Sequence, residues 1–258
     1  MTTTKEFPGN AEFMGERQMN LVALAQDDDL RKQALALQEK AEAHKYGYQQ
    51  LFCGVPIIRL PDDIHAFQEA IWSERPSFIV ETGIARGGSL VMSAALMAMC
   101  GMSARVLGLD ILILGHTRRA IENSPFGNSI ALWEGDSASK EAAGIVEDFI
   151  GDHVTEEPGF LVLDSNHTHN HVLSELEILG PLLPAGSLIF VADTLIEEFP
   201  EGHYPDRSWG PGNNPMTALT QFVKENLDFE PAPEWGRRAL VTEFRDGVLR
   251  RVNPSVKR

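Results

Sequence analysis

Short apolar runs alternate with amphipathic segments along most of the chain. The runs that predict strands are residues 77–81, 105–110, 129–133, 159–164 and 187–193. The segments that predict helices between and beyond them are residues 89–102, 139–150, 172–183 and 216–226. Such alternation is typical of βαβ units, and nearly continuous apolar strands suit a parallel sheet that is covered on both faces. We therefore predict an α/β fold with a Rossmann-like, doubly wound, mostly parallel sheet.

The first quarter of the chain departs from this alternation. Residues 30–48 follow three aspartates and are rich in helix-forming residues, which predicts a long helix. A second helix is predicted over residues 64–73. The long helix has only a weak apolar face, so we expect it to pack against a neighbour in a homo-oligomer or to be a solvated arm. Residues 1–53 are therefore predicted to be a helical extension.

The other end of the chain predicts a β-hairpin. Residues 239–244 and 248–252 read as two strands, and Asp246-Gly247 between them is a hairpin signal. We expect one domain over residues 54–258, with a sheet that ends in this antiparallel hairpin.

Composition excludes several classes of protein. Of the 258 residues, 43% are hydrophobic and 23% are charged, as in ordinary globular domains. A formal charge of −15 disfavours phosphate backbones and anionic membrane surfaces. Residues 1–20 contain no apolar run typical of a signal peptide, and the longest apolar run, residues 90–102, is too short to span a bilayer. We expect a cytoplasmic protein that binds neither nucleic acid nor membrane.

Acidic residues stand at the ends of four predicted strands: Glu81, Asp110, Asp164 and Asp193. A single carboxylate in such a position is commonly a helix cap. Four together indicate a site, because ligands of open α/β sheets bind outside the carboxyl ends of the strands.

The turn after the first strand is rich in glycine and follows Glu81. Residues 81–89 read Glu-Thr-Gly-Ile-Ala-Arg-Gly-Gly-Ser, which is neither the dinucleotide fingerprint nor a P-loop. The absence of both motifs favours a ligand without pyrophosphate. A carboxylate beside the turn favours a ligand that carries a positive charge. S-adenosylmethionine (SAM) carries both a sulfonium and an ammonium group. A purely structural glycine turn is the alternative.

We therefore predict a SAM site. Asp110 is placed to accept two ribose hydroxyls, and Asp136 and Ser137 are placed for the adenine edge. The residues predicted to bind the cofactor are Glu81, Gly83, Arg86, Gly87, Ser89, Asp110, Asp136 and Ser137.

These residues and four further motifs resemble the cephalosporin hydroxylase/rhamnosyl O-methyltransferase family. The further motifs are Leu163-Asp-Ser-Asn-His-Thr168 with His171-Val-Leu173, Asp193-Thr194, Trp209-Gly-Pro-Gly-Asn-Asn-Pro215 and Asp246-Gly-Val-Leu-Arg-Arg-Val252. The resemblance runs from about Gly54 to Val252. It implies a class I SAM-dependent methyltransferase of natural-product biosynthesis, often one that methylates a sugar oxygen with the help of Mg²⁺.

Two residues depart from the family pattern. Asn166 stands where the family usually has aspartate, and Ala192 stands where it usually has a glutamate that resembles a metal ligand. The retained carboxylates are Asp164 and Asp193, which we take as the predicted ligands of a divalent metal.

Methyl transfer to a hydroxyl needs a base or a metal that lowers the pKa of that hydroxyl. Asp164 and Asp193 could supply two oxygen ligands for Mg²⁺, and His167 could accept the proton. We therefore predict Asp164 and His167 as catalytic residues. The spacing of His167, His169 and His171 leaves a zinc site as a lesser alternative.

Two alternatives to a metal-assisted O-methyltransferase remain open. One is a metal-independent methyltransferase in which His167 is the only catalyst. The other is a non-catalytic protein that binds SAM and assists a companion enzyme. The long loop over residues 196–214 contains His203, Tyr204 and Trp209, which either close over a ring of a small-molecule acceptor or form a structural cover.

Overall fold

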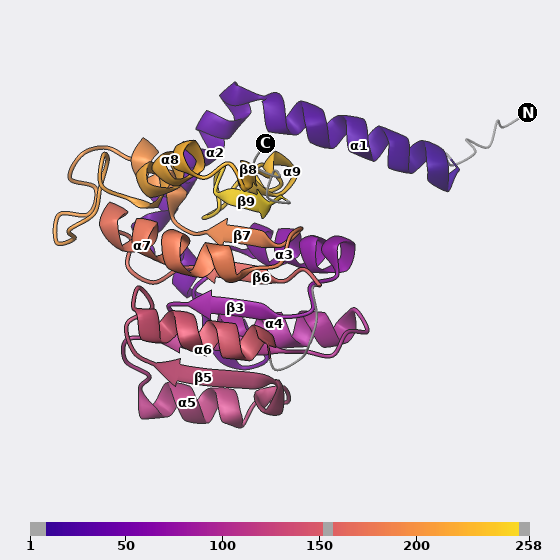
Figure 1. The fold of residues 1–258 in the computed structure, drawn as a ribbon. Helices are drawn as coiled ribbons and strands as arrows, with labels where there is room; N and C mark the ends of the chain where they lie inside the picture. The colour runs from indigo at the N-terminus through magenta and orange to yellow at the C-terminus, as the bar shows by residue number, and fades with distance from the viewer. Residues whose placement is uncertain (1–8, 152–156, 253–258) are drawn as a thin grey trace, which may run out of the picture.

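The fold is a seven-stranded sheet with helices on both faces (Figure 1). The computed structural model describes residues 9–151 and 157–252. The strand order is β5-β4-β3-β6-β7-β9-β8, and the first five strands in this order are parallel. They are β3 (Ile79–Thr82), β4 (Val106–Asp110), β5 (Ile130–Glu134), β6 (Phe160–Leu163) and β7 (Leu188–Val191). The predicted doubly wound, mostly parallel sheet is confirmed.

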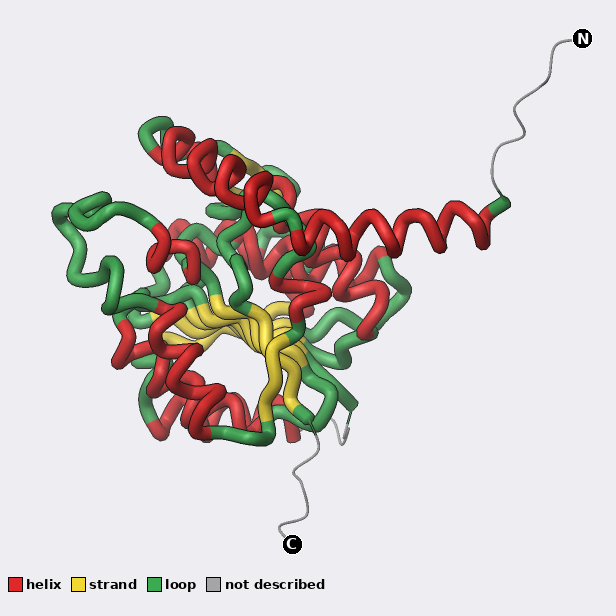
Figure 2. The backbone as a smooth tube through the Cα atoms, turned by 90° about the horizontal axis from the view of Figure 1, so that it is seen from above, coloured by secondary structure: helices red, strands yellow, loops and turns green. Residues whose placement is uncertain are grey.

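The two faces of the sheet bury separate apolar clusters. One face is covered by α3 (Pro61–Glu74), α4 (Gly88–Met99) and α5 (Gly115–Glu122). The other is covered by α6 (Lys140–Gly151), α7 (His169–Leu179) and α8 (Pro215–Glu225). Successive strand residues point to opposite faces, so Ile79 belongs to the first cluster and Val80 to the second. Figure 2 shows the twisted sheet between these layers.

The N-terminal segment forms two helices and a small hairpin. The helices are α1 (Asn10–Gln26) and α2 (Asp28–Glu42), and the hairpin strands are β1 (Gln50–Phe52) and β2 (Val55–Ile57). Asp27 caps α2 by accepting a hydrogen bond from the N–H of Leu30 at 2.9 Å. The predicted helix therefore begins close to its expected start but ends at Glu42. The predicted domain boundary lies in the turn of the hairpin and stays a prediction.

Helix α1 projects away from the body of the molecule (Figure 1). None of its residues is buried within the described part of the chain. An ion pair of 2.6 Å between Arg17 and Glu69 ties it to α3. Because it faces no core, the hydrophobic pattern did not predict it. In the part of the chain that the structure describes, no helix is long and apolar enough to cross a membrane.

The C-terminal end of the sheet is antiparallel, as predicted, but one predicted strand is wrong. Strand β9 (Val248–Arg251) pairs with β7 on one side and with β8 (Phe229–Pro231) on the other. Residues 239–244 form no strand. Buried Asp63 explains the difference, because it accepts hydrogen bonds from the hydroxyl of Thr242 at 2.5 Å and from the N–H of Glu243 at 2.9 Å.

The remaining elements are short. They are α9 (Pro233–Gly236) and the 3₁₀ helices Tyr46–Tyr48, Gly127–Ser129, Gly180–Leu182 and Thr194–Glu198.

Candidate functional site

A cavity of about 340 Å³ lies where β3, β6 and β7 end. The glycine turn forms one wall, the segments after β6 and β7 form another, and the end of α2 and the loop after it complete the cavity. The predicted site residues that line it are Gly83, Arg86, Gly87, Ser89, Asp164, His167 and Asp193. Residues expected to bind cofactor and residues expected to do chemistry thus share one cavity.

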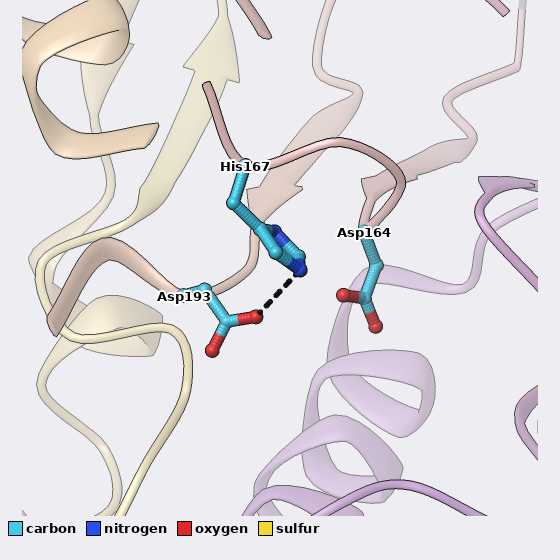
Figure 3. Close-up of side chains that lie close together, drawn as sticks. All are labelled: Asp164, His167 and Asp193. Atoms are coloured by element: carbon cyan, nitrogen blue, oxygen red, sulfur yellow. Dashed lines mark ion pairs between the residues drawn. The ribbon is translucent and has the colours of Figure 1, made fainter. Parts of the chain in front are cut away.

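Asp164, His167 and Asp193 form a compact cluster (Figure 3). One potential ligand atom from each residue lies within 4.8 Å of those of the other two. The imidazole of His167 lies between the two carboxylates, with its Nε2 atom 3.2 Å from Oδ2 of Asp193. The cluster forms because β6 and β7 are parallel neighbours in register, so both aspartates follow the same edge of the sheet. Two carboxylates and an imidazole are a donor set for a divalent cation.

Arg59 lies beneath this cluster and was not predicted. Its side chain is 3% exposed, and its guanidinium nitrogens lie 3.3 Å from Asp164, 3.4 Å from Glu243 and 3.8 Å from Glu81. Burial alone would lower the pKa of Arg59, but the nearby carboxylates, Glu243 first and Asp63 among them, outweigh burial and raise it. Burial raises the pKa of Asp164, and Arg59 opposes that rise. Arg59 therefore stays charged and supports the floor of the site.

Glu81 faces Arg59 instead of the cavity. It is buried at the end of β3, and burial raises the pKa of its carboxyl group against the effect of Arg59. Glu81 is not among the residues that line the cavity, and its predicted contact with a cofactor stays a prediction.

The glycine turn needs its glycines for close packing. Gly83 and Gly87 have φ values of +79° and +85°, which disfavour any side chain. A Cβ atom on Gly83 would lie 2.0 Å from the carbonyl oxygen of Asp164. The turn can therefore approach the cluster only with glycine at this position.

Asp110 holds the glycine turn from the end of β4. Its Oδ2 atom accepts hydrogen bonds from the N–H groups of Ile84 at 2.9 Å and Ala85 at 3.3 Å. Asp136 accepts a hydrogen bond from the N–H of Ala138 at 3.0 Å, within its own turn. These residues follow adjacent strands, and their predicted contacts with ribose and adenine stay predictions.

The three histidines after β6 do not converge. His169 contacts Thr217 at 2.8 Å and Gln221 at 3.1 Å on α8. His171 lies 3.3 Å from the Ser137 hydroxyl and 3.4 Å from Glu175, whose hydrogen bond and charge raise the pKa of the imidazole. Only His167 faces the cavity, because the other two lie on the first turn of α7. The zinc alternative built on three histidines is therefore wrong.

The loop over residues 196–214 covers the cavity. Tyr204 and Trp209 line it, and the ring of Trp209 packs edge-on against His167 with a centroid distance of 4.9 Å. His203 instead packs between Phe199 and Tyr204. Two of the three aromatic residues named from the sequence thus line the cavity, and closure of the loop over an acceptor stays a prediction.

Glu42, the last residue of α2, also lines the cavity. The hydroxyl of Tyr204 donates a hydrogen bond to its Oε2 atom at 3.3 Å. The N-terminal segment therefore contributes to the site, which no local sequence signal indicated.

A doubly wound sheet with a glycine turn and acidic strand ends is typical of α/β proteins that bind a ligand at the carboxyl ends of the strands. The chain belongs to the Rhamnosyl O-methyltransferase/CmcI family, whose model matches residues 44–252. The predicted resemblance is confirmed, and so is the prediction of a methyltransferase enzyme at the level of the family.

Individual relatives agree with this assignment. The chain is 30% identical to the rhamnosyl O-methyltransferase of Mycobacterium tuberculosis over 192 residues, which cover 71% of this chain and 73% of that protein. It is 28% identical to the Mycobacterium leprae protein of the same name, covering 71% and 77%. Among solved structures, a Mg–SAM structure of CmcI matches with a TM-score of 0.54 and 19% identity over 80% of this chain and 78% of that one. This likeness shows the fold.

Proposed function

We propose that the protein is a SAM-dependent O-methyltransferase that methylates a hydroxyl group of a small molecule, a sugar or a natural-product scaffold, with the help of Mg²⁺. The observation that supports it best is one cavity with the glycine turn on one wall and the Asp164–His167–Asp193 cluster on another. Relatives named rhamnosyl O-methyltransferase and a CmcI structure with Mg and SAM support the same activity.

The cofactor is proposed to bind along the glycine turn. Arg86 and Ser89 line this wall, and Asp110 fixes its backbone from behind. The carboxylate of Asp110 has lone pairs beyond the bonds it accepts, which leaves it able to bind ribose hydroxyls. Asp136 and Ser137 remain the proposed adenine contacts.

Asp164 and Asp193 are the proposed metal ligands. Arg59 faces Oδ2 of Asp164, and a carboxylate retains further lone pairs for a cation. Ala192 offers no side-chain ligand, but magnesium sites commonly include only one or two carboxylates and several waters. When bound there, Mg²⁺ would lower the pKa of the acceptor hydroxyl.

His167 is the proposed base. It accepts the proton of the acceptor hydroxyl while the oxygen bonds to the methyl carbon and the sulfur–carbon bond breaks. The products are a methyl ether and S-adenosylhomocysteine (SAH), with the proton on the imidazole. Asp193 and Trp209 hold the imidazole in place, which is the support that a general base needs. The same contact with Asp193 favours the metal-independent alternative as the second candidate.

Methyl transfer from labelled SAM to a panel of glycosides tests this function. We expect a chelator to abolish transfer, magnesium to restore it, and Asp164→Ala to behave like the chelated protein. His167→Ala should lower the rate by a factor on the order of 10²–10⁴. His65→Ala, which removes an exposed histidine on α3, is the matched control.

Each other outcome selects an alternative. Full activity of Asp164→Ala in chelator would reject the metal and leave the metal-independent enzyme. Near-normal turnover of His167→Ala would reject the base. SAH binding without transfer to any acceptor would favour a non-catalytic partner.

We also propose that the chain forms a homo-oligomer, through α1 and not through the predicted helix, because α2 already buries Arg31, Ala34 and Gln38 within its own chain. This helix exposes Met14, Met19 and Val22, whose relative exposures are 49%, 67% and 46%. Light scattering should give a multiple of 28.5 kDa, and Met19→Lys with Val22→Lys should lower that mass. A monomeric wild-type chain would reject this interface. The cytoplasmic location stays a prediction.

A further inference from the structure

Glu42 lines the cavity and forms no ion pair among the residues that the structure describes. Its one hydrogen bond comes from the hydroxyl of Tyr204, at 3.3 Å. The other carboxylates of the cavity differ in this respect. Asp164 and Glu243 face Arg59, and Asp193 faces His167.

The position of Glu42 disfavours an isolated negative charge. The residue is half-buried, and burial first and the charge of Asp193 second raise the pKa of its carboxyl group, against the smaller opposing effects of the hydrogen bond from Tyr204 and the charge of His203. It is also the last residue of α2, where the helix dipole presents partial negative charge and favours a cation. A ligand that brings a positive charge to this point would relieve both effects.

The groups around Glu42 suit an ammonium ion. Tyr48 and Tyr204 both line the cavity, and burial together with the charges of Glu42 and Asp193 raises the pKa of both hydroxyls. Both phenols therefore stay neutral. An ammonium group binds well where a carboxylate and aromatic rings meet.

We propose that Glu42 binds a protonated amine of the acceptor, so that the substrate is an amino sugar or another amine-bearing small molecule. This inference rests on the proposed function. The amine of SAM is the other possible source of the cation. The acceptor is favoured because the polar neighbours of Glu42, namely Tyr204, His203 and Asp193, lie on the segment after β7 and not on the glycine turn.

Calorimetry on protein saturated with SAH tests the inference with three probes. They are the methyl glycosides of glucosamine, N-acetylglucosamine and rhamnose, of which only the first is cationic. We expect wild-type protein to bind the glucosamine probe roughly tenfold or more tightly than the other two. Glu42→Gln should lower the affinity for the glucosamine probe by roughly ten- to hundredfold and leave the affinities for the neutral probes and SAH unchanged. Glu39→Gln, one turn earlier on α2, is the matched control and should bind like wild-type protein.

Three results would overturn the inference. They are equal binding of the charged and neutral probes, no binding of the glucosamine probe to wild-type protein, and weaker SAH binding in Glu42→Gln, which would assign the carboxylate to the cofactor amine. SAH binding without an amine preference refutes this inference alone. Failure of wild-type protein to bind SAH refutes the proposed function and the inference with it.

Discussion

Replacing Arg59 with methionine should destabilise the protein strongly. The guanidinium is 3% exposed and lies within 3.8 Å of Glu81, Asp164 and Glu243. Methionine retains most of the buried volume, so the main effect is the loss of the charge that these carboxylates face. Removing one partner of a buried ion pair costs about 3–5 kcal/mol. We expect the free energy of unfolding at pH 7.5 to fall by about this amount, out of the roughly 5–15 kcal/mol typical of folded domains.

The loss should depend on pH. Burial raises the pKa values of Glu81, Asp164 and Glu243, and removing Arg59 raises them further. A group whose pKa is higher in the folded state loses its stabilising contribution as pH rises through that pKa. The deficit of Arg59→Met should therefore be largest at pH 7.5 and smaller at pH 4.5.

Urea unfolding followed by circular dichroism at the two pH values measures this deficit. Arg119→Met, at an exposed arginine on α5, is the control and should change the free energy of unfolding by no more than about 0.5 kcal/mol. A loss below about 1 kcal/mol in Arg59→Met would refute the reasoning, since breaking a buried pair costs several times more. An equal loss at both pH values would refute the assignment of the effect to carboxylate charge.

Three further predictions concern the support of the site. Burial raises the pKa of Asp63 to about 6, so its contribution to stability is complete below about pH 4 and is lost towards pH 6. In Asp63→Asn, the free energy of unfolding in urea should change less between pH 4 and pH 6 than in wild-type protein. The same pH dependence in both proteins would contradict the raised pKa. Gly83→Ala should lower the melting temperature far more than Gly101→Ala, because both have positive φ but only Gly83 is crowded by backbone. Similar calorimetric melting temperatures would contradict this. Asp110→Ala should weaken SAH binding by roughly 1–3 kcal/mol, and unchanged affinity in calorimetry would remove its ribose assignment.

The core of the fold could be predicted from the hydrophobic pattern. The inner parallel strands β3, β6 and β7 are buried on both faces, so most of their residues are apolar, and α4 (Gly88–Met99) is buried on nearly all sides. Helix α1 was missed because it buries no residue and so carries no pattern. The segment 239–244 was assigned to a strand because its local turn signal is correct, but the tertiary hydrogen bonds to Asp63 determine its conformation.

The candidate site shows the same division between local and long-range signals. Asp164 and Asp193 could be placed together because parallel strands end at one edge of a sheet. Arg59 and Glu42 could not, because neither follows a strand of the main sheet. Arg59 and Asp164, which share a hydrogen bond, are 105 residues apart in the sequence, and Glu42 and Tyr204 are 162 residues apart. Contacts of this range depend on how the N-terminal segment folds back over the cavity.

Calorimetric titration of wild-type protein with SAH tests most directly whether this cavity is the site of a SAM-dependent methyltransferase. The proposed cofactor wall predicts one site per chain with a dissociation constant in the micromolar range, which corresponds to a binding free energy of about −8 kcal/mol. Added SAM should compete for the same site. The absence of binding heat at millimolar SAH, or SAM that fails to compete, would contradict the assignment of the cavity to this cofactor.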